Sequence, residues 1–145
     1  MSVTMVRSRD YPMNICEEIF LDKHISLEAK AIIGILNTHE IRGKNINEFL
    51  SHFKIDNLNE LLNELEINQY YFIYQNTWSD ENETYFCANG LKYSYEDKKD
   101  VIRRAVINYI EIQENNNRIE YSDNQKKEMT DKALSTFIKQ EEIKK

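Results

Sequence analysis

Apolar side chains recur at helical spacing in successive segments between residues 26 and 68. The first stripe predicts a helix capped by Ser26 and ending near Thr38, with apolar positions Leu27, Ala31, Ile32, Ile35 and Leu36. Residues 45–48 and 57–60 each have the Asn-x-x-Glu pattern of a capping box, so each predicts the start of a further helix. The last of these helices ends near Asn68, and its inward stripe is Leu58, Leu61, Leu62 and Leu65.

Residues 70–77 and 84–88 are rich in aromatic and β-branched side chains and flank a polar stretch at 79–82, which predicts a β-hairpin. Helix, helix, helix and hairpin in this order are the plan of the winged helix-turn-helix. Two more helices are expected after the hairpin, one capped by Ser94 and ended by 115–117, the other capped by Ser122. Their apolar stripes are Ile102, Ala105, Val106, Tyr109 and Ile110 in one, and Met129, Ala133, Leu134 and Phe137 in the other.

The expected fold class is therefore mainly α (α+β), a winged helix-turn-helix with a β-hairpin wing and a two-helix C-terminal extension. A chain of 145 residues suits one domain plus an appendage. We place a winged-helix domain with an N-terminal arm at 1–90 and a helical extension at 91–145. The apolar runs are far shorter than the roughly 20 residues of a membrane helix, and the N-terminus lacks the apolar core of a secretory signal. A cytoplasmic protein without membrane contact is expected.

The net charge of -6 is concentrated in one segment. Residues 56–90 contain no Lys or Arg, and their carboxylates are Asp56, Glu60, Glu64, Glu66, Asp80, Glu81 and Glu83. The rest of the chain is almost balanced in charge. All of the excess acidity therefore falls on the predicted third helix and the hairpin.

The segment Phe20-Leu21-Asp22-Lys23-His24-Ile25-Ser26-Leu27-Glu28-Ala29-Lys30 resembles the Leu-x-Asp-x-x-Leu-Ser-x-x-Ala-Lys entry into the first helix of a known family. That family is the winged helix-turn-helix N-terminal domain of replication-initiator and DnaD-like proteins from phages and plasmids of Gram-positive bacteria. Residues 61–70 are similar to its recognition helix and the aromatic residue that begins the wing. The resemblance implies a non-enzymatic, DNA-associated accessory or regulatory protein of a mobile element, acting in replication, partition or transcription.

The resemblance also implies contact with double-stranded DNA through the third helix and wing, where this chain is acidic. Carboxylates repel phosphates, and a major-groove reader normally offers Arg or Lys. A DNA contact would then use the cations elsewhere, which are Arg7 and Arg9 in the arm, Arg42 and Lys44 in a loop, and Lys98, Lys99, Arg103 and Arg104 in the extension. Asp100 is expected to pair with Arg104 and neutralise part of that last group.

A protein partner is the alternative. An inhibitor or adaptor, of an anti-host or anti-defence type and possibly a nucleic-acid mimic, would present its acidic surface to a basic protein. The partner-binding candidates are Asn59, Glu60, Asn63, Glu64, Trp78, Asp80, Glu81 and Glu83. A third possibility is that the acids form an ordinary solvated face. The chain is expected to be a homodimer through its extension or its third helix.

No catalytic residue, metal site or cofactor is expected. The three histidines, His24, His39 and His52, do not combine with Cys16 or Cys87 at the short spacings of zinc ligands. The sequence also lacks a nucleophile motif and a Gly-rich phosphate loop. The protein is therefore predicted not to be an enzyme.

Overall fold

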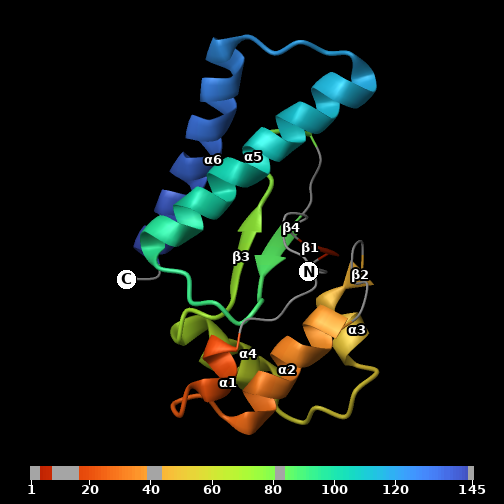
Figure 1. Cartoon of the computed structure of the whole chain (residues 1–145), viewed down its shortest axis with the longest axis vertical. Coiled ribbons are helices and arrows are strands. Elements are labelled where there is room, and N and C mark those ends of the chain that lie inside the picture. Colours follow the sequence, from red (N-terminus) through yellow and green to blue (C-terminus); the bar gives the residue numbers. More distant parts are fainter. Residues whose placement is uncertain (1–3, 8–16, 39–43, 81–83, 144–145) are drawn as a thin grey trace. The chain divides into compact units, whose positions relative to one another are not determined.

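The protein is mainly helical with a small β-sheet, as the sequence predicts (Figure 1). The computed structural model describes residues 4–7, 17–38, 44–80 and 84–143, and the side chains of 17–37, 48–80 and 84–143. Its elements are β1 (Thr4–Arg7), α1 (Glu18–Leu21), α2 (Leu27–Thr38), β2 (Lys44–Asn45), α3 (Ile46–Leu50), α4 (Leu58–Ile67), β3 (Phe72–Gln75), β4 (Thr84–Cys87), α5 (Tyr95–Asn117) and α6 (Asp123–Ile143).

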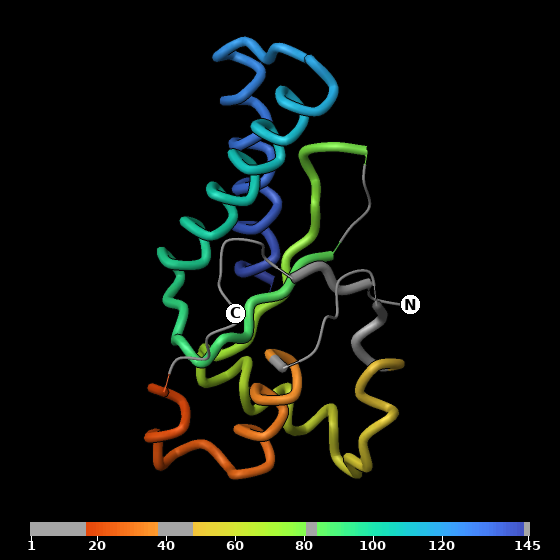
Figure 2. Tube along the Cα trace, turned by 45° about the vertical axis from the view of Figure 1, so that its right-hand side comes forward, coloured from red at the N-terminus to blue at the C-terminus, as the bar shows by residue number. Residues whose placement is uncertain are grey.

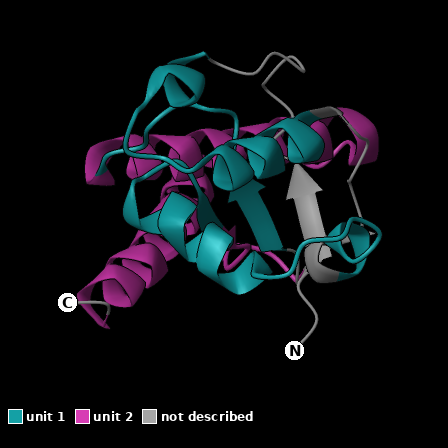
Figure 3. Cartoon of the chain, turned by 90° about the horizontal axis from the view of Figure 1, so that it is seen from below, with its two compact units in different colours: residues 1–73, 83–94 teal, residues 74–82, 95–145 magenta. Residues whose placement is uncertain are grey.

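The chain divides into two compact units (Figure 3). The first consists of residues 1–73 and 83–94, and the second of residues 74–82 and 95–145. The sequence instead places everything up to residue 90 in one domain, so that boundary stays a prediction. The second unit thus takes the end of β3 and the stretch after it, as well as the two C-terminal helices.

The sheet is larger than the predicted hairpin and has the strand order β2-β1-β4-β3. β1 is antiparallel to β2 and parallel to β4. Arg7, expected in an N-terminal arm, is instead the last residue of β1 and lies opposite Phe86. A four-residue strand that pairs with a distant segment gives no periodic signal of its own, which is why sequence reasoning missed it.

α2 forms where it was predicted, but part of its buried face was predicted wrongly. Ser26 caps the helix, because its hydroxyl oxygen accepts a hydrogen bond of 3.2 Å from the backbone N–H of Ala29. Leu27, expected in the core, is 80% exposed, and Ala31 is also exposed. The apolar residues that α2 buries are Ala29, Ile32, Ile33 and Leu36, which recur at i, i+3, i+4 and i+7.

α4 packs on α2 through the predicted leucines. Leu61 and Leu65 are buried, while Leu58 and Leu62 are partly buried against the same core. The expected capping box is absent at this helix, since Asn57 makes no side-chain cap hydrogen bond. The helix therefore begins without the reciprocal bonds that its sequence suggests.

The C-terminus of α4 closes with a Schellman motif. The N–H of Tyr70 donates to the carbonyl of Leu65 at 2.8 Å, and the N–H of Gln69 donates to that of Glu66 at 3.0 Å. Gln69 takes the left-handed conformation that the motif needs, with φ 69°. The turn delivers Tyr70 into the core, where it is fully buried.

A buried asparagine links the helical and sheet parts of the first unit. Asn37 is 4% exposed, and its amide donates to the carbonyl of Ala88 at 2.5 Å and to that of Ile33 at 2.8 Å. A buried amide is tolerated in a core when its hydrogen bonds are made. The bond to Ile33 stays within α2, and the bond to Ala88 fixes the end of α2 to the segment that follows β4.

The second unit contains α5 and α6, which run antiparallel and side by side (Figure 2). The predicted cap of α6 is confirmed as a capping box, because Gln125 N–H donates to Ser122 Oγ at 3.2 Å and Ser122 N–H donates to Gln125 Oε1 at 2.8 Å. The rings of Tyr95 and Phe137 stack with centroids 5.5 Å apart. Of the predicted stripes, Ile102, Val106, Ile110, Ala133 and Phe137 are buried.

Candidate partner-binding surface

The solvent face of α4 carries amides and a carboxylate. Asn59, Glu60 and Asn63 are exposed, as the sequence predicts. An open hollow of about 470 Å³ lies at the start of this helix, lined by Ile55, Asp56, Asn57, Leu58, Asn59 and Glu60. Residues 56–90 contain no Lys or Arg. No cation therefore lies on α4, and none is among the residues that line this hollow.

Glu64 was expected on the same solvent face, and that expectation is wrong. Its carboxylate is half-buried and accepts hydrogen bonds from the backbone N–H of Ser26 at 2.7 Å and from the Ser26 hydroxyl at 2.8 Å. The first N–H groups of a helix lack partners within the helix, and the positive end of the helix dipole favours an anion. Glu64 therefore fixes the start of α2 against α4 rather than facing solvent.

Trp78 is buried rather than available as a surface anchor. Its side chain is 6% exposed, inside a turn that Asn76 organises. The Asn76 Oδ1 atom accepts from the N–H groups of Trp78 and Ser79 at 3.1 Å and 3.0 Å. Asp80 is exposed at the end of the same turn, while Glu81 and Glu83 lie outside the described residues.

The structure describes the side chains of only four of the predicted cations. Arg7 and Lys44 belong to β1 and β2, where the backbone alone is described, and Arg9 and Arg42 lie outside the described residues. Lys98, Lys99, Arg103 and Arg104 all lie on α5. Among the predicted DNA-binding cations, side-chain contacts can therefore be described only for those on α5.

Ion pairs along α5 neutralise part of its positive charge. Lys99 pairs with Glu96 at 3.2 Å, and Arg103 pairs with Asp100 at 2.6 Å. The expected pairing of Asp100 with Arg104 is therefore wrong, since the i, i+3 arginine takes the carboxylate. Arg104 is exposed, and its Nε contacts only the backbone carbonyl of Asp100, at 3.5 Å.

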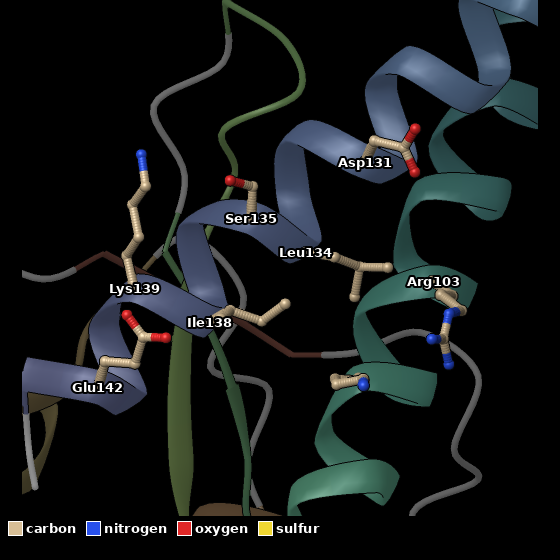
Figure 4. A pocket seen from close by; sticks show the side chains of 8 residues that line it. Arg103, Asp131, Leu134, Ser135, Ile138, Lys139 and Glu142 are labelled. Carbon is tan, nitrogen blue, oxygen red and sulfur yellow. The ribbon is translucent and has the colours of Figure 1, made fainter.

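A groove of about 540 Å³ lies between α5 and α6 (Figure 4). It brings together two of the predicted cations with side chains of both charges, namely Lys99, Arg103, Asp131, Leu134, Ser135, Ile138, Lys139 and Glu142. Figure 4 shows Arg103 on one helix across from Leu134 and Asp131 on the other. A groove with carboxylates among its cations does not match a polyanion along its length.

Sequence reasoning missed one polar cluster of the first unit. The Tyr70 hydroxyl donates to Asp22 Oδ2 at 2.7 Å, and the ammonium of Lys92 lies 3.6 Å from the same oxygen and 5.3 Å from the Tyr70 ring centroid. The Tyr70 hydrogen bond, helped by the N–H of His24 and the charge of Lys92, lowers the pKa of Asp22 below its ordinary value. The three residues come from distant segments, so no local pattern could reveal the cluster.

Comparison with known proteins does not identify this chain, because no family model, no curated protein and no solved structure matches it. Within the part of the chain that the structure describes, no helix is both long and apolar enough to cross a membrane. Among the same residues, no group of three or more His, Cys, Asp or Glu side chains is arranged to hold a metal ion.

Proposed function

We propose that the protein is a non-enzymatic accessory or regulatory protein whose N-terminal part is a winged-helix module that binds a basic protein partner. The observation that carries this proposal is the chemistry of α4. The helix that a winged helix would place in the major groove exposes Asn59, Glu60 and Asn63 and has no cation. Its surface therefore suits a positively charged protein better than a phosphate backbone.

The order of the elements supports the winged-helix assignment. α2, α3 and α4 precede β3 and β4, and these two strands are neighbours in the sheet. The resemblance of residues 20–30 to the phage and plasmid replication proteins supports the same assignment and favours a role in a mobile element. A fold alone does not determine what a protein binds, so the partner is inferred from the residues on the surface of α4.

The internal bonds of Glu64 add to the case against a conventional DNA reader. A recognition helix presents its outward side chains to base edges. In α4 the Glu64 carboxylate is held by Ser26, which leaves Asn59 and Asn63 as the remaining polar readers, beside the charged Glu60. Two amides next to a carboxylate would read adenine only against electrostatic repulsion.

The test compares two labelled probes in anisotropy titrations of the whole chain at low and moderate salt. One probe is random-sequence duplex DNA, and the other is a lysine-rich peptide. We expect the peptide to bind in a salt-sensitive way, and we expect Glu60→Lys to weaken that binding while Asn63→Ala, which keeps the charge, leaves it unchanged. Tight duplex binding that Asn59→Ala or Asn63→Ala reduces would overturn the proposal.

DNA association through α5 is the second candidate. The favourable observation is Arg104, which is exposed and whose Nε contacts a backbone carbonyl, whereas Lys99 and Arg103 each pair with a carboxylate of α5. If duplex DNA binds at low salt, Arg104→Ala should weaken the binding more than Arg103→Ala does. Equal effects of the two substitutions would remove the reason to prefer this helix.

A further inference from the structure

Three helix ends of the first unit carry large aliphatic side chains that face solvent. Leu21 ends α1 and is 73% exposed, Leu27 begins α2 and is 80% exposed, and Ile67 ends α4 and is 71% exposed. A single exposed Leu is ordinary on a protein surface, whereas several gathered at one place mark a contact region. The three side chains therefore indicate a contact region if their helix ends lie together.

Hydrogen bonds bring the start of α2 to the last turns of α4. Ser26, the residue before Leu27, donates to the Glu64 carboxylate at 2.7 Å and 2.8 Å. Ile67 follows Glu64 by three residues, so the two side chains lie on neighbouring positions of the same helix surface. The residue before Leu27 is therefore bonded to α4 one turn before Ile67.

A second hydrogen bond brings the end of α1 to the same place. Asp22 follows Leu21 and accepts a bond of 2.7 Å from the hydroxyl of Tyr70, three residues after Ile67. Figure 1 shows α1, the start of α2 and the end of α4 close together in the lower part of the first unit. We call Leu21, Leu27 and Ile67 the apolar patch.

The elements that carry the apolar patch are acidic. Over residues 17–38 and 58–67 the carboxylates are Glu17, Glu18, Asp22, Glu28, Glu60, Glu64 and Glu66, against the cations Lys23 and Lys30. Asp22 and Glu64 are used internally, Asp22 in part by Lys92, whereas Glu17, Glu18 and Glu28 are exposed. An apolar centre with a mainly acidic rim is complementary to an apolar centre with a basic rim.

We propose that the apolar patch and its exposed carboxylates are the docking site for a basic amphipathic helix of the partner protein. This inference rests on the proposed function and specifies what the basic partner presents. An amphipathic helix supplies apolar side chains one turn apart for the patch, with Lys and Arg beside them for Glu18 and Glu28. A second copy of this chain is a poor occupant, because a two-fold contact would set the same carboxylates opposite one another.

The test uses two synthetic peptides of identical leucine and lysine composition. In one, the leucines lie on a single helical face; in the other, the order is scrambled so that no apolar face forms. Anisotropy titration of the whole chain should show the patterned peptide binding about tenfold tighter than the scrambled one. Leu27→Ser and Ile67→Ser should each weaken the patterned peptide by about tenfold, with circular dichroism unchanged because both side chains are exposed.

The control is Glu60→Lys, which alters the α4 face and leaves the patch residues in place. If Glu60→Lys abolished binding while Leu27→Ser and Ile67→Ser had no effect, the patch would be excluded and the acidic face of α4 would remain as the binding surface. Equal affinity for the two peptides would also overturn the docking site, since charge alone would explain it. Loss of a dimer in Leu27→Ser, measured by light scattering, would assign the patch to self-association and contradict the proposal.

Discussion

The Glu64 carboxylate accepts two hydrogen bonds from Ser26, one from its backbone N–H at 2.7 Å and one from its hydroxyl at 2.8 Å. A single side chain of α4 thus supplies the acceptor that the first turn of α2 needs, across 38 residues of sequence. Bonds to a charged acceptor are stronger than bonds between neutral groups. The start of α2 therefore depends on a residue of another helix.

Removing this carboxylate should destabilise the first unit. We expect Glu64→Ala to lower the free energy of unfolding by about 1–2 kcal/mol, because two partly buried donors lose their acceptor. Urea denaturation followed by circular dichroism measures the loss. The matched control is Glu60→Ala, one turn earlier on the same helix and exposed, which should change stability by less than about 0.5 kcal/mol. Equal losses in the two variants would mean that the Ser26 bonds contribute nothing.

Glycine at position 69 should stabilise the protein. Gln69 has φ 69°, a conformation in which any side chain with a Cβ is strained and glycine is not. We expect Gln69→Gly to raise the free energy of unfolding by about 0.5–1 kcal/mol. The greater entropy that glycine gives the unfolded chain reduces this gain. Gln69→Ala keeps the Cβ and should be close to neutral. A Gly variant that is less stable than the Ala variant would contradict the strain argument.

Asp22 should make stability depend on pH in the acid range. Its pKa is lowered in the folded protein, first by the Tyr70 hydroxyl, so the unfolded chain binds a proton more readily than the folded one. The resulting stability is present above the ordinary carboxyl pKa of 3.8 and is lost as the pH falls through the lower folded value. Urea midpoints measured across this range should fall more steeply for the wild type than for Asp22→Asn. Tyr70→Phe should reduce the pH dependence as well, and parallel curves for all three proteins would disprove the linkage.

Burial of Trp78 can be checked by its fluorescence. It is the single tryptophan of the chain, so emission reports on this site alone. With its side chain 6% exposed, we expect emission at short wavelength and several-fold weaker acrylamide quenching than in the urea-unfolded chain. Quenching as strong as in the unfolded chain would show that Trp78 is exposed, and Trp78 would again be a candidate for partner binding.

The sequence predicts where the helices lie better than it predicts which of their residues are buried. α2, α4, α5 and α6 are recovered because apolar periodicity and capping residues are local signals. The exposure of Leu27 was missed, because the first residue of a helix can fit a stripe and still lie beyond the partner that covers it. Periodicity gives the face, whereas the packing partner decides which end of that face is covered.

The candidate site is less predictable than the fold, because its contacts join distant segments. Helical spacing places Glu60 and Glu64 on one outward face, yet Glu64 turns to Ser26, a residue that no spacing within α4 could indicate. The cluster of Asp22, Tyr70 and Lys92 likewise joins three separate stretches of chain. Charge composition was more informative, since it identified the acidic character of α4 without any knowledge of the contacts.

The parallel pairing of β1 with β4 also affects how the chain folds during synthesis. Met5 lies opposite Thr84, so β1 leaves the ribosome long before its partner strand has been made. The helices α2 and α4 can meet earlier, whereas the sheet must wait for a long loop to close, which is a slow kind of contact to form. Residues 74–82 also belong to the second unit although they precede the last part of the first. The two units are therefore interleaved in translation and cannot be completed one after the other.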